Sequence, residues 1–175
     1  IAGGGSDAFT IDSNTGELFT RFVFDLEAEN QPTDYELVAV AEDKGTPVSS
    51  STTDLLITIQ DVNDNCPEVN DIENNVQLHP NNEAGTLITH VSATDADSGL
   101  NGQLVYGFYQ ASNMITSLFD INSDNGTIVS KDVLSGGEYN IAVEISDQAD
   151  PPCSIQTVVM VQVSIEAPTT KMTTI

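Results

Sequence analysis

The residues with the clearest chemistry form a run near the middle of the chain, Asp61-Val62-Asn63-Asp64-Asn65. Its aspartates and asparagines carry oxygen donors on short side chains, which is what a hard divalent cation such as Ca²⁺ requires. Such a cluster is also typical of an ordinary turn, because these side chains accept hydrogen bonds from their own backbone. An EF-hand is excluded, since the sixth and twelfth positions hold Cys66 and Ile72 instead of Gly and Glu.

Charge and hydropathy narrow the classes of function. The 175 residues include 27 Asp and Glu but only 4 Lys and Arg, a net charge of −23 at pH 7. This charge disfavours binding to nucleic acid or to anionic membrane surfaces, which attract positive proteins. The longest apolar stretch, from Val158 to Ile165, is too short to span a membrane. Alternating apolar runs argue against disorder.

Period-two alternation predicts β-strands that occur twice along the chain. Tyr35, Leu37, Ala39 and Ala41 share one face of a predicted strand. Apolar runs on either side of residues 12–16 predict a hairpin. The hairpin recurs with Phe119 in the place of Phe9, and the strand recurs with Tyr139 in the place of Tyr35. An all-β repeat of about one hundred residues predicts tandem β-sandwiches.

The repeat divides the chain into three predicted parts. Residues 1–65 are the C-terminal part of a first repeat, residues 66–168 a complete repeat and residues 169–175 a Thr-rich tail. Few residues precede Phe9, so we expect the first repeat to lack about two strands and to be unstable alone. No signal peptide opens the sequence, and we expect the chain to be a piece of a longer protein.

Carboxylates gather at the predicted strand ends. If two sandwiches stack end to end, strand ends meet at the joint, and the acids would repel each other unless cations lie between them. Scattered acids on solvated loops are the alternative. The residues that would converge are Asp25, Glu27, Asp61, Asp64, Asp95, Asp97 and Asp147.

Taken together, the motifs resemble tandem cadherin repeats over residues 1 to about 168. Residues 61–67 match that family's linker motif Asp-x-Asn-Asp-Asn-x-Pro, and residues 95–102 match its Asp-x-Asp loop. Residues 25–27 resemble its Asp-Arg-Glu motif with Leu26 in the middle, and Asp43 and Asp147 each end a similar strand. The resemblance implies tandem Greek-key β-sandwiches of about seven strands per repeat, with outer, middle and inner Ca²⁺ ions at the joint.

The resemblance also implies a ligand set for each ion. The outer ion would bind Asp25 and Glu27, and the middle ion Glu27, Asp61, Asp64, Asp97 and the Val62 carbonyl. The inner ion would bind the Asn63 side chain, the Asn65 and Asn101 carbonyls, and Asp95, Asp97 and Asp147. The family's early glutamate would precede residue 1, so we predict that the outer ion binds weakest.

The far end of the second repeat departs from the family pattern. Asn81 stands in the place of the early glutamate, residues 132–137 hold no recognisable Asp-Arg-Glu motif, and residues 164–168 replace the linker. We therefore expect this end to bind no Ca²⁺.

Two cysteines, Cys66 and Cys153, can form a disulfide, which would indicate an oxidising compartment. The resemblance puts both near the joint, and we favour the disulfide over two buried thiols. Asn125 begins an N-glycosylation sequon. His79 and His90 have no partners at metal-ligand spacing and are interpreted as surface or edge residues.

The function implied by the resemblance is a calcium-rigidified segment of an adhesion protein, membrane-anchored, on the extracellular side of the plasma membrane. Its partners would be cadherin-type proteins on neighbouring cells, homophilic or heterophilic. A calcium-binding spacer or an acidic matrix protein without adhesive activity are the alternatives. A hydrolase with paired carboxylates is disfavoured because no Ser/His/Asp or Cys/His set is evident, and we predict that the chain is not an enzyme.

Overall fold

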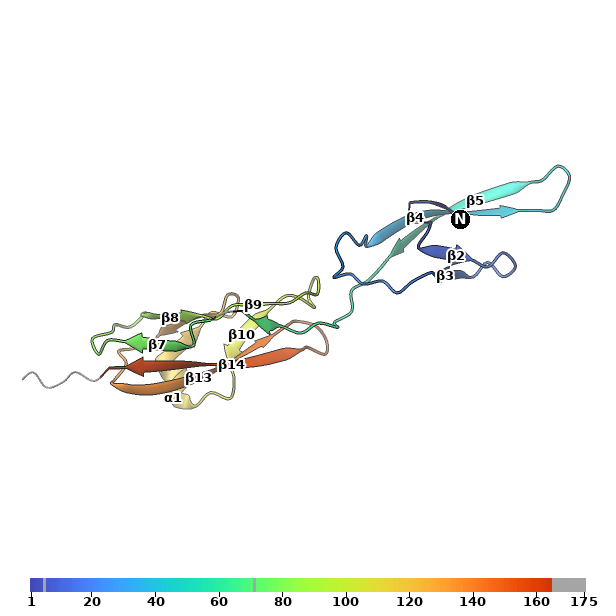
Figure 1. Cartoon of the computed structure of the whole chain (residues 1–175). Helices are drawn as coiled ribbons and strands as arrows, with labels where there is room; N and C mark the ends of the chain where they lie inside the picture. Colours follow the sequence, from blue (N-terminus) through green and yellow to red (C-terminus); the bar gives the residue numbers. More distant parts are fainter. Residues whose placement is uncertain (5, 71, 165–175) are drawn as a thin grey trace, which may run out of the picture. The chain divides into compact units, whose positions relative to one another are not determined.

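The computed structural model describes residues 1–4, 6–70 and 72–164. The chain divides into two compact units, residues 1–61 and 62–175, and β-strands dominate both (Figure 1). The predicted Thr-rich tail and Ile165, the end of the longest apolar stretch, lie outside the described residues.

The first unit contains a sheet in the order β1-β4-β5 and a separate hairpin, β2-β3. Phe9 of the hairpin and Tyr35 of β4 pack edge to face with ring centroids 5.1 Å apart, and both side chains are buried. Among the described residues of this unit, β5 pairs only with β4 and β3 only with β2. The strands are β1 Ala2–Gly3, β2 Phe9–Ile11, β3 Leu18–Thr20, β4 Asp34–Glu42 and β5 Ser50–Thr58.

The second unit is a β-sandwich. A four-stranded sheet, β10-β13-β14-β7, and a three-stranded sheet, β11-β12-β8, both contribute side chains to one core that includes Phe119, Ile141 and Val161. In the long strands β13 and β14, buried side chains alternate with more exposed ones, so one face of this sheet packs into the core. The elements are β6 Glu68–Val69, β7 Asn75–Leu78, β8 Leu87–His90, β9 Ala93–Thr94, β10 Val105–Phe108, α1 Asn113–Leu118, β11 Phe119–Ile121, β12 Thr127–Ser130, β13 Gly137–Ser146 and β14 Ser154–Val163.

The predicted repeat is present in the strand register. Tyr35 of β4 pairs with Ile57 of β5, and the matching Tyr139 of β13 pairs with Val161 of β14. Both pairs of strands are antiparallel. In the second unit β14 also pairs in parallel with β7, a contact that has no counterpart among the described residues of the first unit.

The sequence did not predict the helix α1. Its six residues are too few to show a helical period, and it is recognised only by its cap, where Ser112 Oγ accepts a hydrogen bond from Ile115 N at 3.3 Å. Ile115 is buried in the core, so tertiary packing stabilises a helix too short to persist alone. None of the described helices is long and apolar enough to cross a membrane.

Candidate metal centre

The run at the middle of the chain is held against the Asp-x-Asp loop by Asn65. Its backbone N donates to Asp97 Oδ2 at 3.2 Å, and its Nδ2 donates to Asp97 Oδ1 at 2.7 Å and to Asp64 Oδ1 at 2.9 Å. Just before it, Asp64 N donates to the Val62 carbonyl at 2.7 Å. The sequence assigned Asn65 only through its carbonyl, and its side-chain bonds to two carboxylates are a new finding.

The loop of residues 95–102 folds back on itself. Asp97 N donates to Asp95 Oδ1 at 3.0 Å. Gly102 passes so close to Asp97 that a Cβ there would overlap the Asp97 carbonyl oxygen. Only glycine permits this approach, which gives a physical reason for the Asn-Gly that ends the motif. Asn101 is half-buried in the same loop.

Asp147 lies directly after β13 and is 3% exposed. Its Oδ1 accepts hydrogen bonds from Ala149 N and Cys153 N, each at 3.1 Å, and Cys153 N also lies 3.0 Å from Oδ2. These backbone donors hold the Asp147 carboxylate in one orientation. Gln148 N donates to the Leu100 carbonyl at 3.0 Å, so this loop is tied to the Asp-x-Asp loop.

The first unit has the same arrangement after β4. Asp43 Oδ1 accepts from Ser49 N at 2.9 Å and from Gly45 N at 3.0 Å. These bonds from Ser49 and Gly45 hold the pKa of Asp43 below its ordinary value. The repeat could therefore have revealed the donors to Asp147, which sequence reasoning missed.

Two buried oxygens lack a hydrogen-bond donor among the described residues, Asn63 Oδ1 and Asp95 Oδ2. Burying a polar oxygen without a partner costs about 1–3 kcal/mol, so such an atom requires an explanation, for which a bound ion is one. The Asn63 amide is held from its other end, where Nδ2 donates to the Pro151 carbonyl at 3.3 Å. The predicted inner ion uses oxygens of both side chains, so the residues present fit a hard cation.

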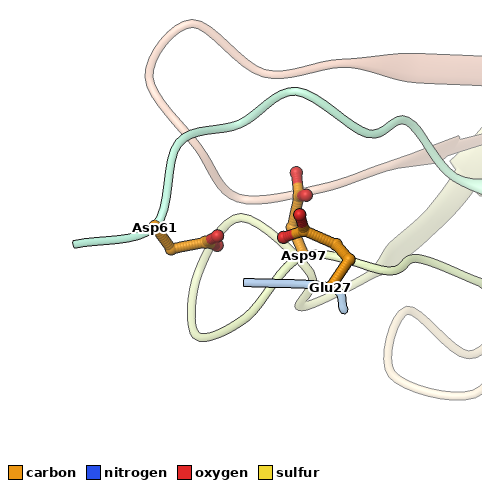
Figure 2. Close-up of side chains that lie close together, drawn as sticks. All are labelled: Glu27, Asp61 and Asp97. Carbon is orange, nitrogen blue, oxygen red and sulfur yellow. The ribbon is translucent and has the colours of Figure 1, made fainter. Parts of the chain in front are cut away.

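In the first unit, Glu27 and Asp61 offer carboxylate oxygens within 4.8 Å of one another. Figure 2 labels these two side chains together with Asp97 of the second unit. Glu27 N donates to Asp25 Oδ1 at 3.2 Å, so the acidic motif after β3 forms a local turn. Carboxylates this close repel each other when ionised, and a cation between them removes the repulsion.

Positive side chains are absent from the sequence near the acids of the second unit, Asp64, Asp95, Asp97 and Asp147. No Lys or Arg occurs between Lys44 and Lys131 or between Lys131 and Lys171. Backbone N–H groups and the Asn65 amide therefore provide the hydrogen bonds described above, and the negative charge itself is available to a metal ion.

The cysteines form the predicted disulfide, Cys66–Cys153, with the two Cα atoms 5.4 Å apart. Cys66 follows directly after Asn65, and Cys153 immediately precedes β14. His79 and His90 are both exposed, as the sequence indicated.

Hydrogen bonds of the second unit thus connect four of the predicted ligands directly, namely Asp64, Asn65, Asp95 and Asp97. Asn63 and Asp147 both bond to backbone groups of the loop at residues 149–151. Asp25, Glu27 and Asp61 belong to the first unit and are described only within it.

Comparison with known proteins identifies the family. The family model for the cadherin domain matches residues 1–60 and 74–164. This chain belongs to the cadherin family. Protocadherin gamma-A4 of Pan troglodytes is 37% identical over 149 residues, covering 79% of this chain and 16% of the relative. Protocadherin-16 of Homo sapiens is 34% identical over 169 residues, covering 95% of this chain and 5% of the relative. The chain therefore spans a small part of these cadherin relatives.

Solved cadherin structures share the fold. Extracellular cadherin domains 3–6 of protocadherin gamma B2 superpose with a TM-score of 0.80 at 26% identity, covering 92% of this chain and 39% of that one. Domains EC1–4 of Drosophila N-cadherin give a TM-score of 0.69 at 29% identity, with coverages of 94% and 39%. The predicted tandem Greek-key sandwiches are confirmed. Cadherin repeats are adhesion and structural domains, not enzymes.

Proposed function

We propose that this chain is a calcium-binding segment of a cadherin-type cell-adhesion protein, in which Ca²⁺ makes the joint between two repeats rigid. The proposed boundaries of the repeats are those of the sequence prediction, residues 1–65 and 66–168. The proposed ligands are Asp25, Glu27, Asp61, Val62, Asn63, Asp64, Asn65, Asp95, Asp97, Asn101 and Asp147.

The pair of buried oxygens without donors carries this proposal. Asn63 Oδ1 lies in the linker motif, and Asp95 Oδ2 lies in the Asp-x-Asp loop. A chain that only needed acidic loops for solubility would leave these oxygens in water, where they cost nothing. Bound Ca²⁺ would accept both oxygens as ligands, because it takes six to eight oxygens from carboxylates, amides and carbonyls.

Different residues of the two units orient or supply the proposed ligands. In the second unit, the Asn65 amide orients Asp97 and Asp64, and the backbone N–H groups of Ala149 and Cys153 orient Asp147. In the first unit, the Glu27 and Asp61 carboxylates form an acidic pair. We propose that this pair and Asp97 share an ion, so that the energy of binding depends on the joint being closed.

The location and partners follow from the family and remain part of the proposal. The intact protein would be anchored in the plasma membrane with these repeats on the extracellular side. It would meet cadherin-type partners on neighbouring cells. Extracellular modules bind Ca²⁺ with Kd values of about 10⁻⁴–10⁻³ M, so the sites would be filled outside cells and empty inside them.

The test is thermal melting of the chain with and without Ca²⁺, in the wild type and in Asp97→Asn. The substitution keeps an oxygen that can accept from Asn65 but removes the charge. At a Ca²⁺ concentration of about 100 Kd, one site adds about 2.7 kcal/mol to the stability of the wild type, and we expect Asp97→Asn to lose most of this gain.

The matched control is Asp124→Asn, which removes one charge from an exposed turn of the second unit. It should retain the full response to Ca²⁺. A wild-type midpoint that does not move in millimolar Ca²⁺, or an equal gain in Asp97→Asn, would contradict the proposed function. Small-angle X-ray scattering then tests rigidity, since Ca²⁺ should narrow the distribution of distances between the two units.

A further inference from the structure

The Cys66–Cys153 disulfide connects the two segments that carry ligands for the inner ion. Its half-cystines are 87 residues apart in the sequence. Cys66 directly follows the run that contains Asn63 and Asn65, and Cys153 belongs to the loop that holds Asp147. Besides this bond, Asn63 Nδ2 of the run donates a hydrogen bond to the Pro151 carbonyl at 3.3 Å.

The first unit shows that a disulfide is not needed to orient the aspartate that follows the strand. At the position of Cys153, the first unit has Ser49, whose N donates to Asp43 as Cys153 N donates to Asp147. The distances are 2.9 Å for Ser49 and 3.1 Å for Cys153. The loop after the strand thus orients its aspartate with a serine in this place, and the sulfur contributes nothing to that local geometry. Its contribution is the covalent link to Cys66, which directly follows the run at residues 61–65.

We propose that the Cys66–Cys153 disulfide is a positioning device for the calcium site, which fixes Asn63 and Asn65 against the Asp147 loop before an ion binds. This inference rests on the proposed function and concerns the regulation of the same site. Without the link, ordering the run would cost conformational entropy at the moment of binding. A site that is already ordered avoids this cost and binds more tightly.

The link also makes the site sensitive to reducing agents. Cys66 is an exposed residue and Cys153 is half-buried, so we expect an external dithiol to attack at Cys66. In that exchange the protein S–S bond breaks, both sulfurs leave as thiols, and the dithiol is oxidised to its own cyclic disulfide. Because coupling between two equilibria is reciprocal, an ion that binds the linked form more tightly also protects the link.

The experiment compares the oxidised wild-type chain with the double variant Cys66→Ser/Cys153→Ser. Ca²⁺ affinity is measured by isothermal titration calorimetry. We expect the variant to bind the inner ion with a Kd about tenfold higher, since both Asn63 and Asn65 must then be ordered at the moment of binding.

The control for general loss of stability is Gly85→Ala. Gly85 has φ +84° with nothing near its Cβ position, so alanine there strains the backbone away from the site. This control should melt earlier but retain the wild-type Ca²⁺ affinity. If it loses affinity as much as the double variant does, the effect is one of stability and the positioning role is wrong.

The remaining outcomes separate this inference from the proposed function. An oxidised wild type that binds no Ca²⁺ overturns both. A double variant with the wild-type Kd overturns only the positioning role. If the double variant does not fold, the rate of disulfide reduction by dithiothreitol in the wild type decides: Ca²⁺ should slow it at least severalfold, while an equal rate with Ca²⁺ and with Mg²⁺ overturns the inference.

Discussion

Single side chains make matching contacts at matching positions of the two hairpins. Asp12 Oδ1 accepts from Asn14 N at 2.7 Å and Thr15 N at 3.0 Å. In the second unit Asn122 Oδ1 accepts from Asp124 N at 2.9 Å and Asn125 N at 3.1 Å. An aspartate and an asparagine thus serve the same turn, because the turn needs only an oxygen acceptor on a short side chain.

The charge of Asp12 has a separate consequence at low pH. Hydrogen bonds from Asn14 N and Thr15 N lower its pKa below the ordinary value. A lowered pKa means that the ionised form stabilises the folded hairpin above about pH 4, and this stabilisation is lost as the pH falls through the folded-state pKa. We expect an NMR titration of the Asp12 carboxyl to show a midpoint below 3.9, the usual value for Asp.

Asp12→Asn is the matched variant for this prediction, since Asn122 already fills the corresponding place. It should keep the turn at neutral pH and abolish the titration seen through the Asn14 and Thr15 amide resonances. A carboxyl midpoint at or above the usual value would show that these two hydrogen bonds do not favour the charged form.

At the scale of elements, each hairpin turn contains a glycine with positive φ, Gly16 or Gly126, but only Gly126 lies close to neighbouring residues. Gly126 has φ +69°, and its N donates to the Asn122 carbonyl at 2.9 Å. A Cβ there would overlap the Val91 carbonyl oxygen and lie 2.9 Å from the Tyr106 ring. The hairpin β11-β12 therefore approaches its neighbours more closely than any other residue type would allow.

This close approach predicts unequal effects of two alanine substitutions in the second unit. Gly85→Ala introduces backbone strain alone and should lower the free energy of unfolding by about 1–2 kcal/mol. Gly126→Ala adds a collision with backbone atoms and should lower it by at least about 1–3 kcal/mol more. Unfolding in urea measures both; equal losses would mean that the hairpin can move away from Val91 at little cost.

At the scale of the whole molecule, charge is the dominant feature. A chain with net charge −23 repels itself, and added salt screens exposed charges separated by more than about 10 Å at 0.1 M. Screening acts on all charges alike, whereas a site of ordered oxygens selects an ion by its size and coordination.

Sodium chloride and calcium chloride at equal ionic strength should therefore stabilise the chain unequally. We expect a few millimolar Ca²⁺ to raise the melting midpoint clearly more than the matched NaCl solution, with Mg²⁺ between them because it retains its water ligands. Equal midpoints in the three solutions would show that the acids act only through general screening.

Local and repeated patterns in the sequence determined much of this protein. The duplicated hairpins and strands were predicted because period-two alternation and turn residues are encoded within a few positions. The family was predicted from the resemblance of its linker and Asp-x-Asp motifs, and the disulfide from the two cysteines, which that resemblance places near the joint. Short-range rules did not predict α1, whose Ile115 is ordered by the core rather than by helical propensity.

Only the tertiary structure decided how the acidic loops are held. Hydrogen bonds join residues that are 6 to 88 positions apart in the sequence: Asn65 to Asp97, Asn63 to Pro151 and Cys153 to Asp147. Their sequence separation hides them, because a hydrogen bond depends on distances that packing sets. The same packing buries Asn63 Oδ1 and Asp95 Oδ2 without donors; a motif can name these residues, but only the fold shows which of their oxygens lack a partner.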